Sequence, residues 1–507
     1  MGIGMNAGMW AHGAANPLLG AHASADQLAA VLQDSKAREE LFKALTIGHN
    51  LTQPSVAPGV GFPQTLESLE FNLRNATFRA EHLTMWRMIP KMPAFNTREQ
   101  FNRINSYGQA GISGWVPEAG TPSTVDSEYE RAYVDIKYMS VLTEISLVAM
   151  LIKPAHGPIA AQEQLAKTMF LLGSLNGAIY YGDSSLDALQ FDGLDKQIAD
   201  NVADDHIFDL RGEPIGEEDL VDGCLVAGAG ESFGRVTDIF MGPEVKSDLG
   251  KILFPRSRVD QAAVDNQGYY VGGEVNGFKG PFGRVTFRED VFVNPSQGIG
   301  LSLLNPQASG VGDATRRPAA PSRTAVDTTP PNAASQFGAD DAGDYYYWVA
   351  AANAYGISAA VRATDDASTP ITVAEGDDVR FGFTPGGSND PATEYYILYR
   401  TKVGGASAAS ASKIIARIPN DAGAGETTII DLNATLPGTT SSYGLQFNQD
   451  NLAYKQLAPL LGVPFGTQAL SMRKALVLFG APAVYLPKHN FILRNVGRPV
   501  GARGLYA

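Results

Sequence analysis

The 507-residue chain is 44% hydrophobic and 18% charged, with 54 Gly and 30 Pro, which is typical of a soluble, turn-rich globular protein and argues against an all-helical fold. Domains usually run to about 100–200 residues, so this length predicts two or three packed units. The formal net charge of −14 argues against a surface that grips nucleic acid through its phosphates, yet it is compatible with a container for DNA.

Residues 1–60 are predicted to form an N-terminal arm and a helix. The first 24 residues are mostly Gly, Ala, Asn and His, so they would need a partner to become ordered. Between Ala25 and Ile47, apolar residues recur on roughly one side of a helix, with charged residues available for the other. The apolar residues are Leu28, Leu32, Leu41, Phe42 and Leu45.

A long polar segment, about 96–131, contains four glycines and two prolines and has no apolar pattern of its own. A structureless loop of this size is uncommon inside a compact domain, so we expect a projecting arm or hairpin. Tyr133–Tyr138 follows with the alternation of a half-buried strand. Apolar residues at helical spacing then predict a long helix over about 158–181, started by Pro158 and ended at Gly182.

Residues of about 200–300 alternate between helical and strand patterns, which predicts a mixed α and β unit. The expected helices are Glu217–Ala229 and Pro243–Leu253, and the expected strands are Arg235–Met241, Tyr269–Val271 and Arg284–Phe287.

A Pro-, Ala- and Asp-rich stretch from Asn305 to Asp344 has the composition of a linker. Short strand candidates follow at near-regular spacing with turn residues between them, which is typical of an antiparallel β-sandwich. They are Tyr345–Ala352, Ile371–Val373, Val379–Thr384, Tyr395–Thr401, Lys413–Ile418 and Thr427–Leu432. Long apolar runs return in 446–507, so we predict that 306–445 is inserted into a first domain made of 61–305 and 446–507.

The strongest enzymatic candidate is Gly230-Glu-Ser-Phe-Gly234, which matches the G-x-S-x-G motif of serine hydrolases. That motif needs a strand before the serine and a helix after it, whereas here a helix is predicted before Ser232 and a strand after it. His489 is the sole histidine downstream of Ser232. We therefore predict a simple turn and no catalytic residue.

No metal or cofactor site is predicted. The seven histidines include no pair three to five residues apart, and the acidic doublets lack the ligand spacing of a calcium loop. Cys224 is the sole cysteine, which excludes an intrachain disulfide and fits a reducing cytoplasm. No stretch reaches about 18 consecutive apolar residues, so a membrane partner is not expected.

The order of these elements resembles the major capsid proteins of tailed phages, which share the Hong Kong 97-like capsid fold. The likeness covers about 25–300 and 450–500, and it rests on Tyr133–Glu144 after the long loop, Ala178–Asp183 at the helix end, Asp238–Pro243, and Gly277–Gly283. The resemblance implies an α+β fold with an N-arm, an extended loop at 96–131, a peripheral domain with a spine helix at 158–181, and an axial domain at 200–300.

The insertion resembles a fibronectin or immunoglobulin-like module. This resemblance rests on Trp348–Ser358 and Ala392–Arg400, although these two segments occur in reversed order.

The resemblance to phage capsid proteins implies hexamers and pentamers that close into an icosahedral shell around double-stranded DNA. The expected location is the virion, after assembly in the host cytoplasm, with portal, scaffolding and decoration proteins as candidate partners. The alternatives are an encapsulin-type nanocompartment, a hydrolase built on Ser232, and a cell-surface adhesin.

Overall fold

The computed structural model describes residues 77–108, 112, 114–152, 157–202, 204–229, 232–257, 275–280, 282–294, 305–329, 332–363, 369–386, 392–421, 425–466 and 470–499. The predicted N-terminal arm and helix and the predicted strand Tyr269–Val271 lie outside these residues. No helix in the described part is long and apolar enough to cross a membrane.

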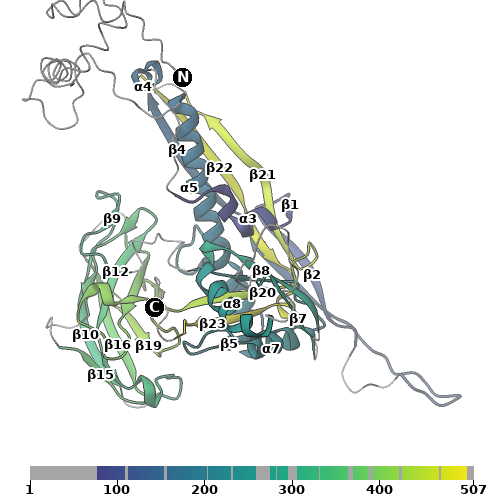
Figure 1. Ribbon diagram of the computed structural model, residues 1–507. Helices are drawn as coiled ribbons and strands as arrows, with labels where there is room; N and C mark the ends of the chain where they lie inside the picture. The colour runs from purple at the N-terminus through teal and green to yellow at the C-terminus, as the bar shows by residue number, and fades with distance from the viewer. Residues whose placement is uncertain are drawn as a thin grey trace, which may run out of the picture. The chain divides into compact units, whose positions relative to one another are not determined.

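A four-stranded sheet and one long helix form the first part of the main body. The sheet has the order β1 (Lys91–Pro93), β21 (Leu452–Pro464), β22 (Ser471–Val484) and β4 (Lys137–Ser146), so it combines strands from both ends of the chain. Helix α5 (Ile159–Tyr181) lies along β4 and β22 (Figure 1). The short helices α3 (Thr84–Met88) and α4 (Leu147–Leu151) pack beside them.

Helix α5 confirms the predicted helix over 158–181. Pro158 precedes its first turn, where a missing N–H costs nothing, and the Gly182 N–H closes the last turn on the Ala178 carbonyl. Burial is confined to the second half of the helix, where Leu171 and Ile179 enter the core. Leu165, expected on the buried side, is exposed.

A second, six-stranded sheet shares the same core. Its order is β5 (Ile207–Asp209), β23 (Phe491–Val496), β20 (Thr440–Leu445), β6 (Asp238–Met241), β8 (Gly283–Glu289) and β7 (Gly277–Gly280). Helices α7 (Glu217–Gly228) and α8 (Pro243–Ser257) pack on it through a cluster that includes Leu220, Leu249 and Phe287, and α6 (Leu194–Ala199) joins the first layer. The predicted helices at 217 and 243 are thereby confirmed.

Two predictions are corrected here. Tyr133–Tyr138 is not one strand, because the chain passes at the buried Ile136 from β3 (Glu128–Asp135), which pairs in the hairpin, to β4 in the four-stranded sheet. Residue 445 is too late an end for the insertion, because β20 pairs with β6 and β23 inside the six-stranded sheet.

Residues 305–436, which we call the inserted module, fold around a core of their own. One sheet has the order β18 (Lys413–Pro419), β17 (Tyr395–Arg400), β12 (Tyr347–Asn353), β13 (Gly356–Ile357) and β9 (Val311–Gly312), with β14 (Val361–Arg362) on β12. A second has the order β10 (Ala319–Thr329), β16 (Asp378–Gly386) and β19 (Thr427–Asp431), and β11 (Gly343–Tyr345) pairs β15 (Ile371–Val373). Val349, Phe381 and Ile429 meet between the two larger sheets.

The strand predictions within this module are confirmed from Ile371 onward, and Tyr345–Ala352 is interrupted at Tyr346. The expected linker is wrong over 319–329, where β10 pairs along most of β16. Tyr345 and Tyr347 are buried in the module core.

One buried carboxylate joins three elements of the main body. Asp290 accepts hydrogen bonds from the Met85 N–H (3.0 Å), the Asn176 amide (3.0 Å) and the Tyr180 hydroxyl (3.1 Å). Burial raises the pKa of this carboxyl, which the hydrogen bonds partly oppose. The group therefore fixes α3 against α5.

Candidate functional site: a hairpin, a cleft and an apolar strip

The segment between the first two large strands forms a hairpin, as predicted for the region around 96–131. Strands β2 (Arg98–Ser106) and β3 pair from Arg98↔Asp135 to Ser106↔Glu128 and extend away from the sheets (Figure 1). On one face, Arg98 forms an ion pair with Asp135 at 2.6 Å and lies 4.4 Å from the ring centre of Tyr133. Both partners are largely exposed, so this pair adds little stability.

The opposite face of the hairpin is fastened to the main body. Arg103 makes two hydrogen bonds to Glu130, at 2.6 and 2.8 Å, and a third to the Asn201 side chain at 3.1 Å. The hydrogen bonds from Arg103 and then Asn105 lower the pKa of Glu130 to about 2. Phe101 packs edge-on against Tyr485 at 4.8 Å. These contacts fix the base of the hairpin.

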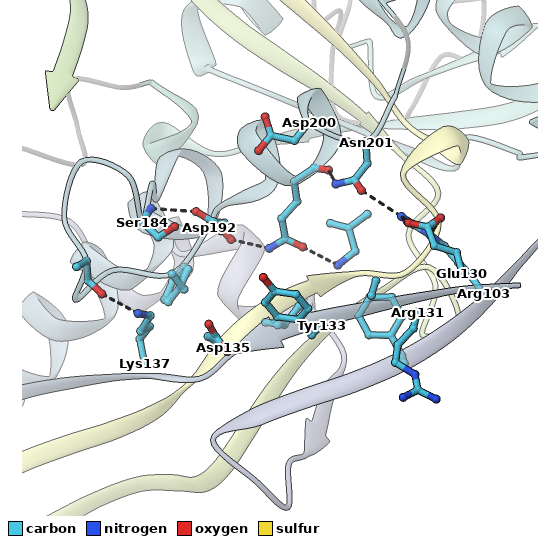
Figure 2. A pocket seen from close by; sticks show the side chains of 17 residues that line it. Arg103, Glu130, Arg131, Tyr133, Asp135, Lys137, Ser184, Asp192, Asp200 and Asn201 are labelled. Atoms are coloured by element: carbon cyan, nitrogen blue, oxygen red, sulfur yellow. Dashed lines mark hydrogen bonds and ion pairs between the residues drawn. The ribbon is translucent and has the colours of Figure 1, made fainter.

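A cleft of about 520 Å³ lies between the hairpin base and the turn that precedes α6 (Figure 2). Figure 2 shows that its polar groups bond to one another: the Lys137 ammonium donates to the Ala188 carbonyl at 2.6 Å, and Asp192 accepts from the Ser184 N–H at 2.9 Å. Acidic and basic side chains line it in similar numbers. The polar groups that line the cleft are thus partly satisfied by bonds to one another.

The far end of the hairpin exposes aromatic side chains. Trp115 is 93% exposed and Tyr107 is 85% exposed, while Tyr129 on β3 is 70% exposed. Isolated exposed apolar residues are ordinary, but three large aromatics on one arm indicate a surface that is covered by a partner. Polarity alone predicted a projecting segment here, and Trp115 and Tyr107 within its Gly-rich stretch were a usable signal for an exposed aromatic surface.

The four-stranded sheet has an apolar face that the described residues leave partly exposed, and we call it the apolar strip. Met139 and Val141 of β4 turn toward the core, so Tyr138 and Leu142 turn away from it and are exposed. The pairing of β4 with β22, and of β22 with β21, places side chains of all three strands on this face. The ring centres of Tyr138 and Phe479 are 5.3 Å apart. The strip consists of Tyr138, Leu142, Leu461, Val463, Val477 and Phe479.

Ser232 lies in the turn between α7 and β6, the reverse of the order that a nucleophile elbow needs. Its hydroxyl is 3.3 Å from Nε2 of His206, whereas the sequence pattern pointed to His489 as the histidine for a hydrolase. Nδ1 of His206 faces the Asn490 carbonyl at 2.9 Å, where a catalytic triad would have a carboxylate. The His489 ring forms a hydrogen bond with the Ser232 backbone, and His489 also lies against Gly234. The contact between Ser232 and His206 spans 26 residues, so sequence spacing gave no signal for it.

The described residues contain no cluster of three or more His, Cys, Asp or Glu side chains that would hold a metal. Cys224 is buried among the apolar residues of α7 and the six-stranded sheet, and this burial raises the pKa of its thiol to about 11. At neutral pH it is a protonated core residue and not a nucleophile.

No protein-family model matches the chain. The chain is 24% identical over 476 residues to the major capsid protein of Staphylococcus phage K, covering 90% of this chain and 95% of the relative. The same values hold for the major capsid protein of Staphylococcus phage S25-3. The chain is therefore a homologue of phage major capsid proteins over nearly its full length.

Among solved structures, the capsid of Myoviridae phage XM1 aligns with a TM-score of 0.41 and 9% identity, covering 86% of this chain and 99% of that one. The SrpI encapsulin of Synechococcus elongatus PCC 7942 aligns with a TM-score of 0.35 and 9% identity, covering 86% and 95%.

Proposed function

We propose that this chain is the major capsid protein of a tailed bacteriophage, whose copies form hexamers and pentamers that close into an icosahedral shell around double-stranded DNA. The observation that carries the proposal is the relationship to phage major capsid proteins along 90% of the chain. The function is structural.

The surfaces of the subunit support self-association. The aromatic end of the hairpin and the apolar strip both expose large apolar side chains, and apolar surface of this kind is favourable to cover. A stable protein interface buries roughly 1,200–2,000 Å² in total. A projecting arm that lies on a neighbouring copy adds to this area without taking residues from the core of the subunit. The arm of one copy is proposed to lie on the strip of the next.

The charge of the chain supports a container role. A formal net charge of −14 leaves little tendency to adhere to DNA, so the genome would be packed inside without specific recognition. The proposed location is the virion, after assembly in the host cytoplasm, with portal, scaffolding and decoration proteins as candidate partners.

The inserted module is proposed to be an immunoglobulin-like β-sandwich that stands on the outer face of the shell. The module has two sheets around one core, and Phe381 from one sheet and Tyr396 from the other lie in that core. This arrangement supports the sandwich assignment. An insertion that pointed inward would crowd packed DNA, whereas one that pointed outward meets solvent or host surfaces, which suits weak adhesion.

No catalytic role is proposed for Ser232. The G-x-S-x-G match and the contact between Ser232 and His206 favour a hydrolase, and the reversed order of helix and strand opposes it. A fluorophosphonate probe is expected to leave Ser232 unlabelled, and stoichiometric labelling there would revive the hydrolase alternative.

Electron microscopy of the purified protein, expressed alone and with its phage partners, tests the proposal. We expect closed shells or hexameric rings. Monomers under all assembly conditions would contradict it. Shells that enclose a specific protein, and remain free of DNA during infection, would favour the encapsulin alternative instead.

A further inference from the structure

Three residues with an unusual backbone conformation converge where the inserted module meets the main body. Arg211, Asn433 and Asn495 have φ values of 51°, 61° and 52°, in the left-handed region that residues with a side chain seldom adopt. Such conformations cost free energy and persist where surrounding contacts determine them. Arg211 and Asn495 belong to the main body and Asn433 to the module, so their contacts connect the two parts.

Arg211 extends from the turn after β5 to the module. Its guanidinium donates to the Asn433 carbonyl at 2.9 Å, to the Gln336 carbonyl at 2.8 Å and to the Asp341 carboxylate at 2.6 Å. Its own N–H donates to the Asp209 side chain at 2.9 Å, which holds the turn in place. One main-body side chain thus binds two separate module segments.

Asn495, at the end of β23, binds the chain where it leaves the module. Its amide nitrogen donates to the Asp209 carboxylate at 2.7 Å and to the Ala434 carbonyl at 2.8 Å. Its amide oxygen accepts from the Leu436 N–H at 2.9 Å. Asn495 is 3% exposed, so these bonds are formed away from solvent, where an unpaired amide is costly.

Asn433 connects these contacts to the interior of the module. Its amide nitrogen donates to the Asp341 carboxylate at 2.9 Å, and its oxygen accepts from Arg400 at 2.5 Å. Arg400 forms a buried ion pair with Asp431 at 2.6 Å. A continuous hydrogen-bonded path therefore runs from β23 to the core of the module.

We propose that Arg211, Asn433 and Asn495, with Asp341, form an orientation latch that holds the inserted module in one fixed position on the main body. The module is then a rigid extension of the subunit. This differs from the flexible linker that the composition of 305–344 predicted. The latch acts within one subunit, so it does not depend on the proposed capsid function.

Hydrogen–deuterium exchange on the full chain tests the latch. In Arg211→Ala, the amides of 433–439 are expected to exchange at least about tenfold faster, because this segment loses its anchor, while β16 and β17 keep their protection. The matched control is Arg316→Ala, which removes an arginine that lies 3.7 Å from the Tyr355 ring within the module. Exchange in 433–439 should be unchanged in the control.

A second pair of variants serves if Arg211→Ala does not fold. Asn495→Gly keeps the left-handed backbone accessible and loses the side-chain bonds, whereas Asn495→Ala loses the same bonds and strains the backbone as well. Faster exchange in 433–439 in Asn495→Gly supports the latch. Unchanged exchange there, or an equal rise across every module strand, would overturn it, because the residues would then be inert or would only stabilise the module fold.

Discussion

The hairpin and the inserted module are both excursions from the main body, and they are held in shape by different means. The module buries Tyr347, Phe381 and Phe383 between its sheets, so its structure is justified by contacts inside it. The hairpin has two strands, two ion pairs and an end with highly exposed aromatic side chains, and an isolated two-stranded hairpin is marginally stable in water. A projection without a core of its own is stabilised by what it binds, whereas a projection with a core is stabilised by its internal contacts.

The largest effect is expected from removing the end of the hairpin. Replacing residues 107–127 by Asn-Gly, which suits a two-residue turn, should leave folded subunits and abolish closed shells, because the proposed contact with the neighbouring copy is lost. Electron microscopy and size-exclusion chromatography measure the outcome. Phe233→Ala, which truncates an exposed aromatic elsewhere, is the control and should assemble normally. Normal shells from the replacement would show that the hairpin has no part in assembly.

Two excisions of the module should differ sharply. Removing 306–436 with a Gly/Ser bridge should leave a main body that folds and forms shells without surface projections. Removing 310–445 also deletes β20, a central strand of the six-stranded sheet, and should give insoluble protein. Soluble yield and circular dichroism distinguish the two. If both variants fold, the placement of β20 in the main body is wrong.

Phe381→Ala should destabilise the module alone. Phe381 is 1% exposed and lies 4.8 Å from the ring centre of Tyr347, and truncating a buried Phe typically costs about 3–5 kcal/mol. Exchange protection in β16 and β17 should fall, while that of α5 is retained. Parallel loss of protection in α5 would mean that module and main body unfold as one unit.

The smallest effect concerns the hairpin base. The folded pKa of Glu130 is lowered to about 2 from 4.5, so its pair with Arg103 stabilises the base above pH 4.5 and is lost as the pH falls toward about 2. Glu130 is partly exposed, and surface ion pairs contribute up to about 1 kcal/mol. A dye on Ser123→Cys, with Cys224 too buried to compete, should show lower anisotropy in Glu130→Gln than in the parent near neutral pH. This difference should vanish at low pH; a difference that persists there would exclude the ion pair as its cause.

Local signals were sufficient for much of the fold. Ile371–Val373 was predicted with the bounds of β15, and Pro158 and Gly182 fixed the ends of α5, because turn and cap chemistry is encoded by neighbours in the chain. Strand β10 was missed, since Ala319–Thr329 has the composition of a linker and is held extended by its pairing with β16.

The sites depended on distant residues. Nothing near Ser232 indicates His206, and nothing near Arg211 indicates Asp341, because each pair is created by the packing of separate elements. The hairpin was predictable as a projection, since a long polar segment without an apolar pattern has few other uses. Its aromatic end was visible in the sequence, but only the structure showed that Trp115 remains uncovered.

The pairing of β4 with β22 has a consequence for synthesis. Ser471 of β22 bonds to Glu144 of β4, 327 residues earlier, so the four-stranded sheet cannot be completed until almost the whole chain exists. At about 5–20 residues per second, roughly 15–65 s separate the two strands on the ribosome. The inserted module is made of contiguous residues and can fold during that interval. A nascent chain therefore carries a finished module on an unfinished main body, and assembly-competent subunits arise only after release.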